Sequence, residues 1–124
     1  MLTLPPSVRI HIAAAPIDLR RGFDGLANAV RGVLGDDPMS GHLFVFHGKR
    51  GNLVRILFWD RTGYCVLSKR LERGRFHLPR QPAEGSCRIE LTAGELLLML
   101  EGLDLTGAKR ERRWTAETAR LSWR

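Results

Sequence analysis

The chain has 124 residues, of which 44% are hydrophobic, so it has the size of one globular domain with a single core. Its formal net charge of +7 favours polyanionic partners such as nucleic acid or an acidic membrane surface. The sequence has neither an apolar run of transmembrane length nor a signal-peptide pattern, so we expect a cytoplasmic protein without a membrane segment. Cys65 and Cys87 do not have CxxC spacing, so we expect both to be reduced.

A short strand and an amphipathic helix are the first predicted elements. Apolar and polar residues alternate over residues 8–12, as they do on a half-buried strand. Asp18 then has a side chain suited to an N-cap, and apolar residues recur at helical spacing beyond it up to Gly35. Gly22 and Gly25 inside this helix each lower helix propensity by about 1 kcal/mol relative to Ala, so we expect another backbone to pack closely there.

A β-meander is predicted next, with strands over residues 43–46, 53–59 and 64–71. Residues 48–51 are expected to close the first hairpin. Residues 60–63 have Asp first and Gly fourth, which predicts a type I turn at the second hairpin. Because the strand over 53–59 carries apolar residues on both faces, we expect it to be the central strand of the sheet.

A short strand and a second helix follow a linker rich in Pro, Gly and Ser. The strand is expected near residues 88–91, and Thr92 with Glu95 has the spacing of a capping box at the start of the helix. The expected apolar face of this helix is Leu96, Leu97, Met99, Leu100 and Leu103. The sum predicts one α+β domain over residues 1–107, a small antiparallel β-meander packed with two helices, followed by a flexible basic tail over 108–124.

The positive charge lies in two stretches. Residues 47–80 carry nine basic and two acidic side chains, a net +7, and residues 108–124 carry six and two, a net +4. Seventeen of the twenty basic residues are Arg, whose planar guanidinium suits phosphate and carboxylate. The basic residues that come from adjacent strands and turns are expected to converge on one nucleic-acid-binding ribbon. These residues are Lys49, Arg50, Arg55, Arg61, Lys69, Arg70, Arg73 and Arg75. A solubilising sheet edge is the alternative explanation for them.

Aromatic residues and the tail offer two further candidates. Trp59, Tyr64 and Phe76 stand among the cations and are able to stack on bases, although core packing is the commoner role for Trp59 and Phe76. The tail carries a second basic cluster with an aromatic residue, typical either of an arm that orders on a polyanion or a partner protein, or of a solvated terminus. This cluster is Lys109, Arg110, Arg112, Arg113 and Trp114.

No constellation of residues indicates catalysis. The aspartates are explained individually, Asp18 as a cap and Asp60 as the start of a turn, and do not form the carboxylate cluster of a metal-dependent nuclease. The four histidines show neither HxxxH nor HExxH spacing, and Gly48-Lys49 lacks the rest of a P-loop. We therefore expect no enzyme activity, no metal site and no cofactor.

Three runs of sequence identify a family by their order and spacing. They are DLRRGFDGLANAV, GHLFVFHGKRGNLVRILFWDRTGYCVLSKRLERGRF and LTAGELLLMLEGLD. Over about residues 4–105 the chain resembles the TnpB accessory proteins of the bacterial insertion-sequence class numbered sixty-six. The resemblance implies a role in efficient transposition beside a separate DDE-type transposase. His47 and Phe58 stand where the family pattern has Arg and Trp, and the tail beyond Gly107 matches only in being basic.

Three functional hypotheses follow. The first is a transposition accessory protein that contacts the DNA backbone through the basic hairpin and assists the transposase, so DNA, the transposase and other proteins of the same element are the expected partners. The second is a protein adaptor that docks on the transposase without touching DNA, with Trp59 or Trp114 as an anchor. The third is a small metal-independent ribonuclease that uses Arg and His on a basic sheet.

Overall fold

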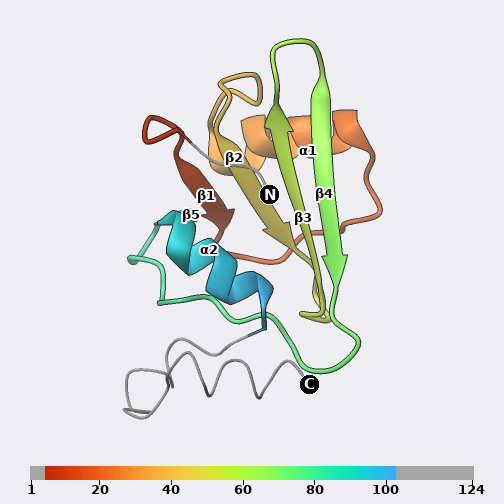
Figure 1. Cartoon of the computed structure of the whole chain (residues 1–124), viewed down its shortest axis with the longest axis vertical. Coiled ribbons are helices and arrows are strands. Elements are labelled where there is room, and N and C mark those ends of the chain that lie inside the picture. The colour runs from red at the N-terminus through yellow and green to blue at the C-terminus, as the bar shows by residue number, and fades with distance from the viewer. Residues whose placement is uncertain (1–4, 103–124) are drawn as a thin grey trace.

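The computed structural model describes residues 5–102, which form a five-stranded sheet with a helix packed on each face (Figure 1). The strands are β1 (Ile10–Ala13), β2 (Leu43–His47), β3 (Leu53–Trp59), β4 (Tyr64–Arg70) and β5 (Arg88–Leu91). They lie in the order β4-β3-β2-β1-β5, and every neighbouring pair is antiparallel except β1 with β2. The predicted α+β class and the β-meander are confirmed.

The centre of the sheet is β2, so the expectation that residues 53–59 would be central is wrong. β1 lies parallel to β2 because the chain returns through the helical segment on one face, and β5 then pairs with the outer side of β1. This places two strands on each side of β2. β3 still has a neighbour on both sides and apolar contacts on both faces, as its sequence indicated.

The helix on one face begins later than predicted. α1 (Phe23–Ala29) continues as a π-helical turn, η1 (Val30–Leu34), and ends at Gly35 with φ of 65°. Its N-cap is Gly22, which makes no side-chain cap, so the assignment of Asp18 as the cap is wrong. Asp18 instead accepts a hydrogen bond from the backbone N–H of Arg20 at 3.0 Å, because a short carboxylate competes well for nearby amides in a turn.

The two glycines of this segment do not mark a close approach of another backbone, contrary to expectation. A Cβ at Gly22 would meet no atom within 4 Å. A Cβ at Gly25 would lie 2.7 Å from the Cβ of Arg21, which belongs to the same stretch of chain. The glycines are therefore not needed for packing against a second element.

Each face of the sheet has its own apolar core. Fully buried Leu26, Phe44 and Leu57 belong to the cluster on the α1 side, and burying each such side chain contributes about 1.5–3 kcal/mol. Val45, Ile56 and Met99 belong to the cluster on the α2 side. Alternation along β2 and β3 sends successive side chains to opposite clusters, which is why both strands are apolar on both faces.

The second helix, α2 (Ala93–Leu100), begins with the predicted capping box. The hydroxyl of Thr92 accepts from the backbone N–H of Glu95 at 3.1 Å, and the carboxylate of Glu95 accepts from the N–H of Thr92 at 2.9 Å. Leu96 and Met99 are buried, but Leu97 is 46% exposed and does not belong to the apolar face as predicted. Leu103 and the boundary expected at residue 107 lie outside the described residues. None of the helices within residues 5–102 has the length and apolar character to span a bilayer.

The turn between β3 and β4 is not type I. Arg61 has φ of 89°, whereas the second residue of a type I turn has a negative φ. The backbone N–H of Asp60 donates to the carbonyl of Gly63 at 3.1 Å, which closes a two-residue hairpin loop. Such loops favour a positive φ at this position because it matches the right-handed twist of the two strands.

Candidate nucleic-acid interface

Five of the eight predicted basic residues lie together at one end of the sheet. Lys49 and Arg50 are in the β2–β3 turn, Arg70 ends β4, and Arg73 and Arg75 are in the loop that follows. All five are exposed. In Figure 1 this is the lower end of β3 and β4. We call these five residues the basic end.

Backbone hydrogen bonds hold the two parts of the basic end against each other. The N–H of Leu71 donates to the carbonyl of Asn52 at 2.8 Å, and the N–H of Phe76 donates to the carbonyl of Gly51 at 2.7 Å. Gly51 has φ of 79°, and a Cβ there would lie 2.7 Å from Nε of Arg75. The guanidinium of Arg75 therefore lies directly over the β2–β3 turn.

The other three predicted residues do not join this cluster. Arg61 is in the turn at the opposite end of the β3–β4 hairpin, and the length of β3 separates the two ends by about 20 Å. Lys69 pairs with Val54 and faces the α2 side, whereas Arg70 pairs with Leu53 and faces the α1 side. Arg55 also faces the α1 side, where its Nη1 donates to the backbone carbonyl of Arg21 at 2.8 Å. The eight residues therefore do not form the single ribbon that the sequence predicted.

A groove of about 540 Å³ lies beside the basic end, between residues 17–20 and the β2–β3 turn. Its basic lining residues are Arg20, Lys49, Arg50 and Arg55. Sequence reasoning missed Arg20 because it assigned residue 20 to a helix. The available signal was Asp18 two residues earlier, a spacing typical of an Asx turn, which keeps this part of the chain out of the helix.

The aromatic candidates are mostly away from the basic end. Trp59 and Tyr64 are half-buried and pack edge to face with ring centroids 5.0 Å apart, near the turn that contains Arg61. Phe76 is at the basic end, but its ring packs against the core on the α2 side. The tail cluster of Lys109, Arg110, Arg112, Arg113 and Trp114 lies outside the described residues.

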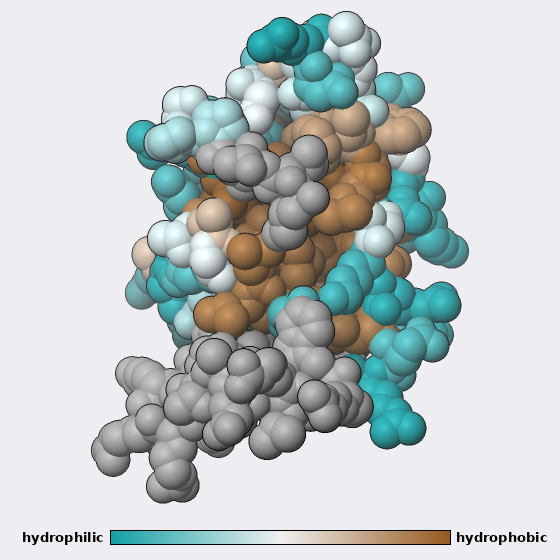
Figure 2. Space-filling view, viewed as in Figure 1, coloured by the Kyte–Doolittle hydropathy of each residue, from teal (hydrophilic) through white to brown (hydrophobic). Residues whose placement is uncertain are grey.

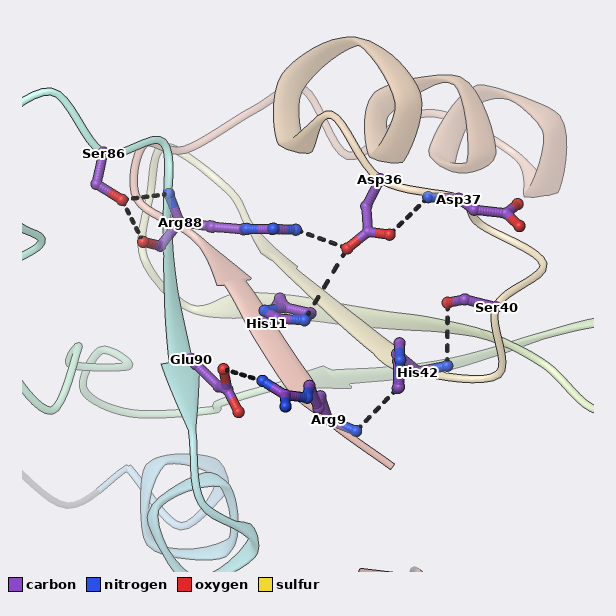
Figure 3. A network of polar contacts seen from close by, with 9 residues as sticks. All are labelled: Arg9, His11, Asp36, Asp37, Ser40, His42, Ser86, Arg88 and Glu90. Carbon is purple, nitrogen blue, oxygen red and sulfur yellow. Dashed lines mark hydrogen bonds and ion pairs between the residues drawn. The ribbon is translucent and has the colours of Figure 1, made fainter. Parts of the chain in front are cut away.

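A second group of charged residues lies at the opposite edge of the sheet, around β1 and β5 (Figure 3). Nη1 of Arg88 donates to the carboxylate of Asp36 at 2.7 Å, and Nε2 of His11 is 4.0 Å from the same oxygen. Arg9 pairs with Glu90 at 3.3 Å. Each carboxylate thus has a cationic partner within the group, which links β1, β5 and the loop after η1.

Within residues 5–102, His11 is buried and His47 is half-buried between elements of the fold. Burial, followed by the charge of Arg88, lowers the pKa of His11 below its ordinary value. Burial also lowers the pKa of His47, whose Nε2 lies 2.8 Å from the carbonyl oxygen of Ala13. Burial thus disfavours the charged form of both rings. Across residues 5–102, no three His, Cys, Asp or Glu side chains are grouped so as to hold a metal ion.

Comparison with known proteins places most of the chain in one family. A family model described as IS66 Orf2 like protein matches residues 8–110. The uncharacterized protein y4hO of Sinorhizobium fredii (strain NBRC 101917 / NGR234) is 41% identical over 104 residues, which cover 84% of this chain and 88% of that protein. The uncharacterized protein y4jC of the same strain is 38% identical over 104 residues, covering 84% and 86%. No solved structure matches the chain.

Proposed function

The chain belongs to the IS66 Orf2-like family, and on that premise we propose that it assists transposition by binding the DNA backbone through its basic end. The family is one of accessory proteins of insertion sequences and is not a known enzyme family. The proposed partners are DNA and the separate transposase of the same element.

The observation that carries the proposal is the uncompensated charge of the basic end. Within residues 5–102, Arg70 is the one member with an ion pair, to Glu72 at 3.9 Å, and both side chains are at least 70% exposed. Such an exposed, long pair neutralises little charge. Five exposed cations at one end of a sheet form a surface that attracts phosphates, whose contacts supply most of the sequence-independent affinity for DNA.

Protection of a sheet edge explains these residues less well. Lys and Arg protect an edge when they lie along the unpaired strand. Of the five, only Arg70 belongs to the edge strand β4, and the others occupy the β2–β3 turn and the loop after β4. Edge protection therefore accounts for one member of the basic end and leaves the clustering of the other four unexplained.

Binding of a fluorescent DNA duplex, followed by anisotropy at about 50 mM salt, tests the proposal. We expect Arg73→Ala/Arg75→Ala to weaken binding by about tenfold or more, since each removed guanidinium loses a charged hydrogen bond to phosphate. The matched control is Arg31→Ala/Arg61→Ala, which removes two exposed arginines elsewhere. Absence of duplex binding by the unaltered protein, or equal losses in the two variants, would contradict DNA contact through the basic end.

Docking on the transposase is the second candidate, favoured by the free side of β4. This strand pairs with β3 alone among the described strands, and its Leu67 is 54% exposed. Figure 2 shows apolar residues gathered in the middle of the face on which α2 lies. An edge strand with an exposed apolar side chain is suited to strand addition by a partner protein.

A pull-down with the transposase of the same element, performed after nuclease treatment, tests this second candidate. Leu67→Asp is expected to abolish capture, because it places a charge in the contact. Val33→Asp is the control, since Val33 is also an exposed apolar residue but lies in η1. Equal capture of both variants would exclude docking at β4. Of the two anchors proposed from the sequence, Trp59 packs on Tyr64, and Trp114 lies outside the described residues.

A further inference from the structure

Arg55, which lines the groove, is a half-buried cation without a counter-ion within residues 5–102. Its guanidinium has one hydrogen-bond partner in the part of the chain that the structure describes, the carbonyl of Arg21 at 2.8 Å. Its Nε is buried and has no partner there. A desolvated charge that lacks both a counter-ion and a full set of hydrogen bonds costs free energy, and a bound anion would remove that cost.

The acidic residue of the groove is already engaged. The guanidinium of Arg20 donates three hydrogen bonds to the carboxylate of Asp18, at 2.9 Å from Nη2 and at 3.1 and 3.3 Å from Nε. These hydrogen bonds hold the pKa of Asp18 well below its usual range, so the carboxylate is charged beside the guanidinium of Arg20. Lys49 and Arg50 on the rim have no ion pair within residues 5–102. The groove therefore presents three cations that lack a carboxylate partner.

The remaining lining of the groove suits a flat, partly polar group. Ile17 and Leu53 are half-buried apolar side chains next to the cations, and Asn52 adds an amide that both donates and accepts hydrogen bonds. A volume of about 540 Å³ is typical of sites for small organic ligands. It has room for a base with its sugar and phosphate, but not for base pairs within a duplex.

We infer that this groove binds a single unpaired nucleotide of DNA. The phosphate lies on Arg55 and the rim cations, the base covers Ile17 and Leu53, and the amide of Asn52 meets the edge of the base. The inference rests on the proposed function and narrows it, because it names unpaired DNA, as at a strand end, as the form that the groove takes. Apolar surfaces tolerate every base, so any base preference of the groove comes from the amide of Asn52 at the edge of the base.

The test is a titration of the ¹⁵N-labelled full chain with a 5′-phosphorylated deoxydinucleotide, followed by amide chemical shifts. We expect saturable shifts at Gly48, Asn52 and Leu53, which line the groove. Arg55→Met keeps the aliphatic stem and is expected to weaken binding by about tenfold, as loss of a charged hydrogen bond does. Arg61→Met is the matched control at the other end of the hairpin and should bind normally.

A second variant and a second ligand complete the test. If Arg55→Met does not fold, Lys49→Ala/Arg50→Ala serves instead, because both side chains are exposed, and weaker dinucleotide binding is again expected. Absence of shifts at the groove amides would overturn the inference, and so would equal affinities of Arg55→Met and Arg61→Met. Inorganic phosphate that binds as tightly as the dinucleotide would also overturn it, since the base would then contribute nothing.

The two proposals fail in different ways. Blunt duplex contacts the basic end and has no unpaired nucleotide, so its binding to the unaltered protein reports on the proposed function alone. Duplex binding without dinucleotide shifts would remove the groove inference and leave the proposed function in place. Dinucleotide shifts in the groove without any duplex binding would support the groove and remove the basic end as a duplex-binding surface.

Discussion

The salt dependence of DNA binding measures how many residues of the basic end contact phosphates. If all five exposed cations contact phosphates, log K should fall with log salt with a slope of about −4.5, since each contact contributes about −0.9. Arg73→Ala/Arg75→Ala removes two contacts, so the slope should become shallower, about −2.7. Raising the salt from about 50 to about 200 mM should then weaken the unaltered protein by about 500-fold and the variant by only about 40-fold.

Anisotropy titrations of one duplex at four or five salt concentrations give both slopes. Arg31→Ala/Arg61→Ala is the appropriate control, because it lowers the net charge equally but leaves the basic end intact, so its slope should match that of the unaltered protein. Equal slopes for the two variants, both shallower than that of the unaltered protein, would mean that net charge, and not the arrangement of the five residues, governs binding. A slope near zero for the unaltered protein would refute phosphate contact altogether.

Two further predictions concern stability. Since burial lowers the pKa of His11, the unfolded state takes up a proton below about pH 6.5 before the folded state does, so stability should fall on acidification by up to about 1.4 kcal/mol per pH unit for this group. Urea unfolding of His11→Gln at several pH values should show a flatter profile, and an unchanged profile would argue against a neutral buried ring. Thr92→Ala removes the cap of α2 and should lower the free energy of unfolding in urea by about 1 kcal/mol. Thr92→Ser keeps a capping hydroxyl and should lose much less.

Local chemistry explains which elements were predictable from the sequence. The capping box of Thr92 and Glu95 depends on residues three apart, and the alternation of β3 depends on residues two apart. Both features could therefore be predicted from the local sequence. The position of β3 in the sheet was not, because it depends on the pairing of β1 with β5, which are far apart in the chain. Asp18 was misassigned because the same side chain serves equally well as a helix cap or a turn former.

The candidate site was predictable in its charge but not in its arrangement. Counting charges identified the stretch that contains the basic end, and strand alternation places Arg55 on the same face as Leu53 and Leu57. Alternation did not show that the segment containing Arg21 covers this face. That cover removes Arg55 from the exposed surface of the hairpin and places it in a groove. The groove around Arg55 exists only because the segment that contains Arg21 crosses the sheet there, and the local sequence does not reveal that crossing.

The pairing of β1 with β5 has a consequence for how the chain folds. Ile10 lies opposite Leu91, so almost the whole described chain must be synthesised before the sheet is complete. β2, β3 and β4 are joined by short turns, so we expect them to form early, because nearby residues meet at little entropic cost. Until β5 arrives, one side of β1 keeps unpaired amides and carbonyls next to apolar residues, a state prone to self-association. A chain that ends before residue 88 is therefore expected to aggregate, even though it would contain the entire basic end.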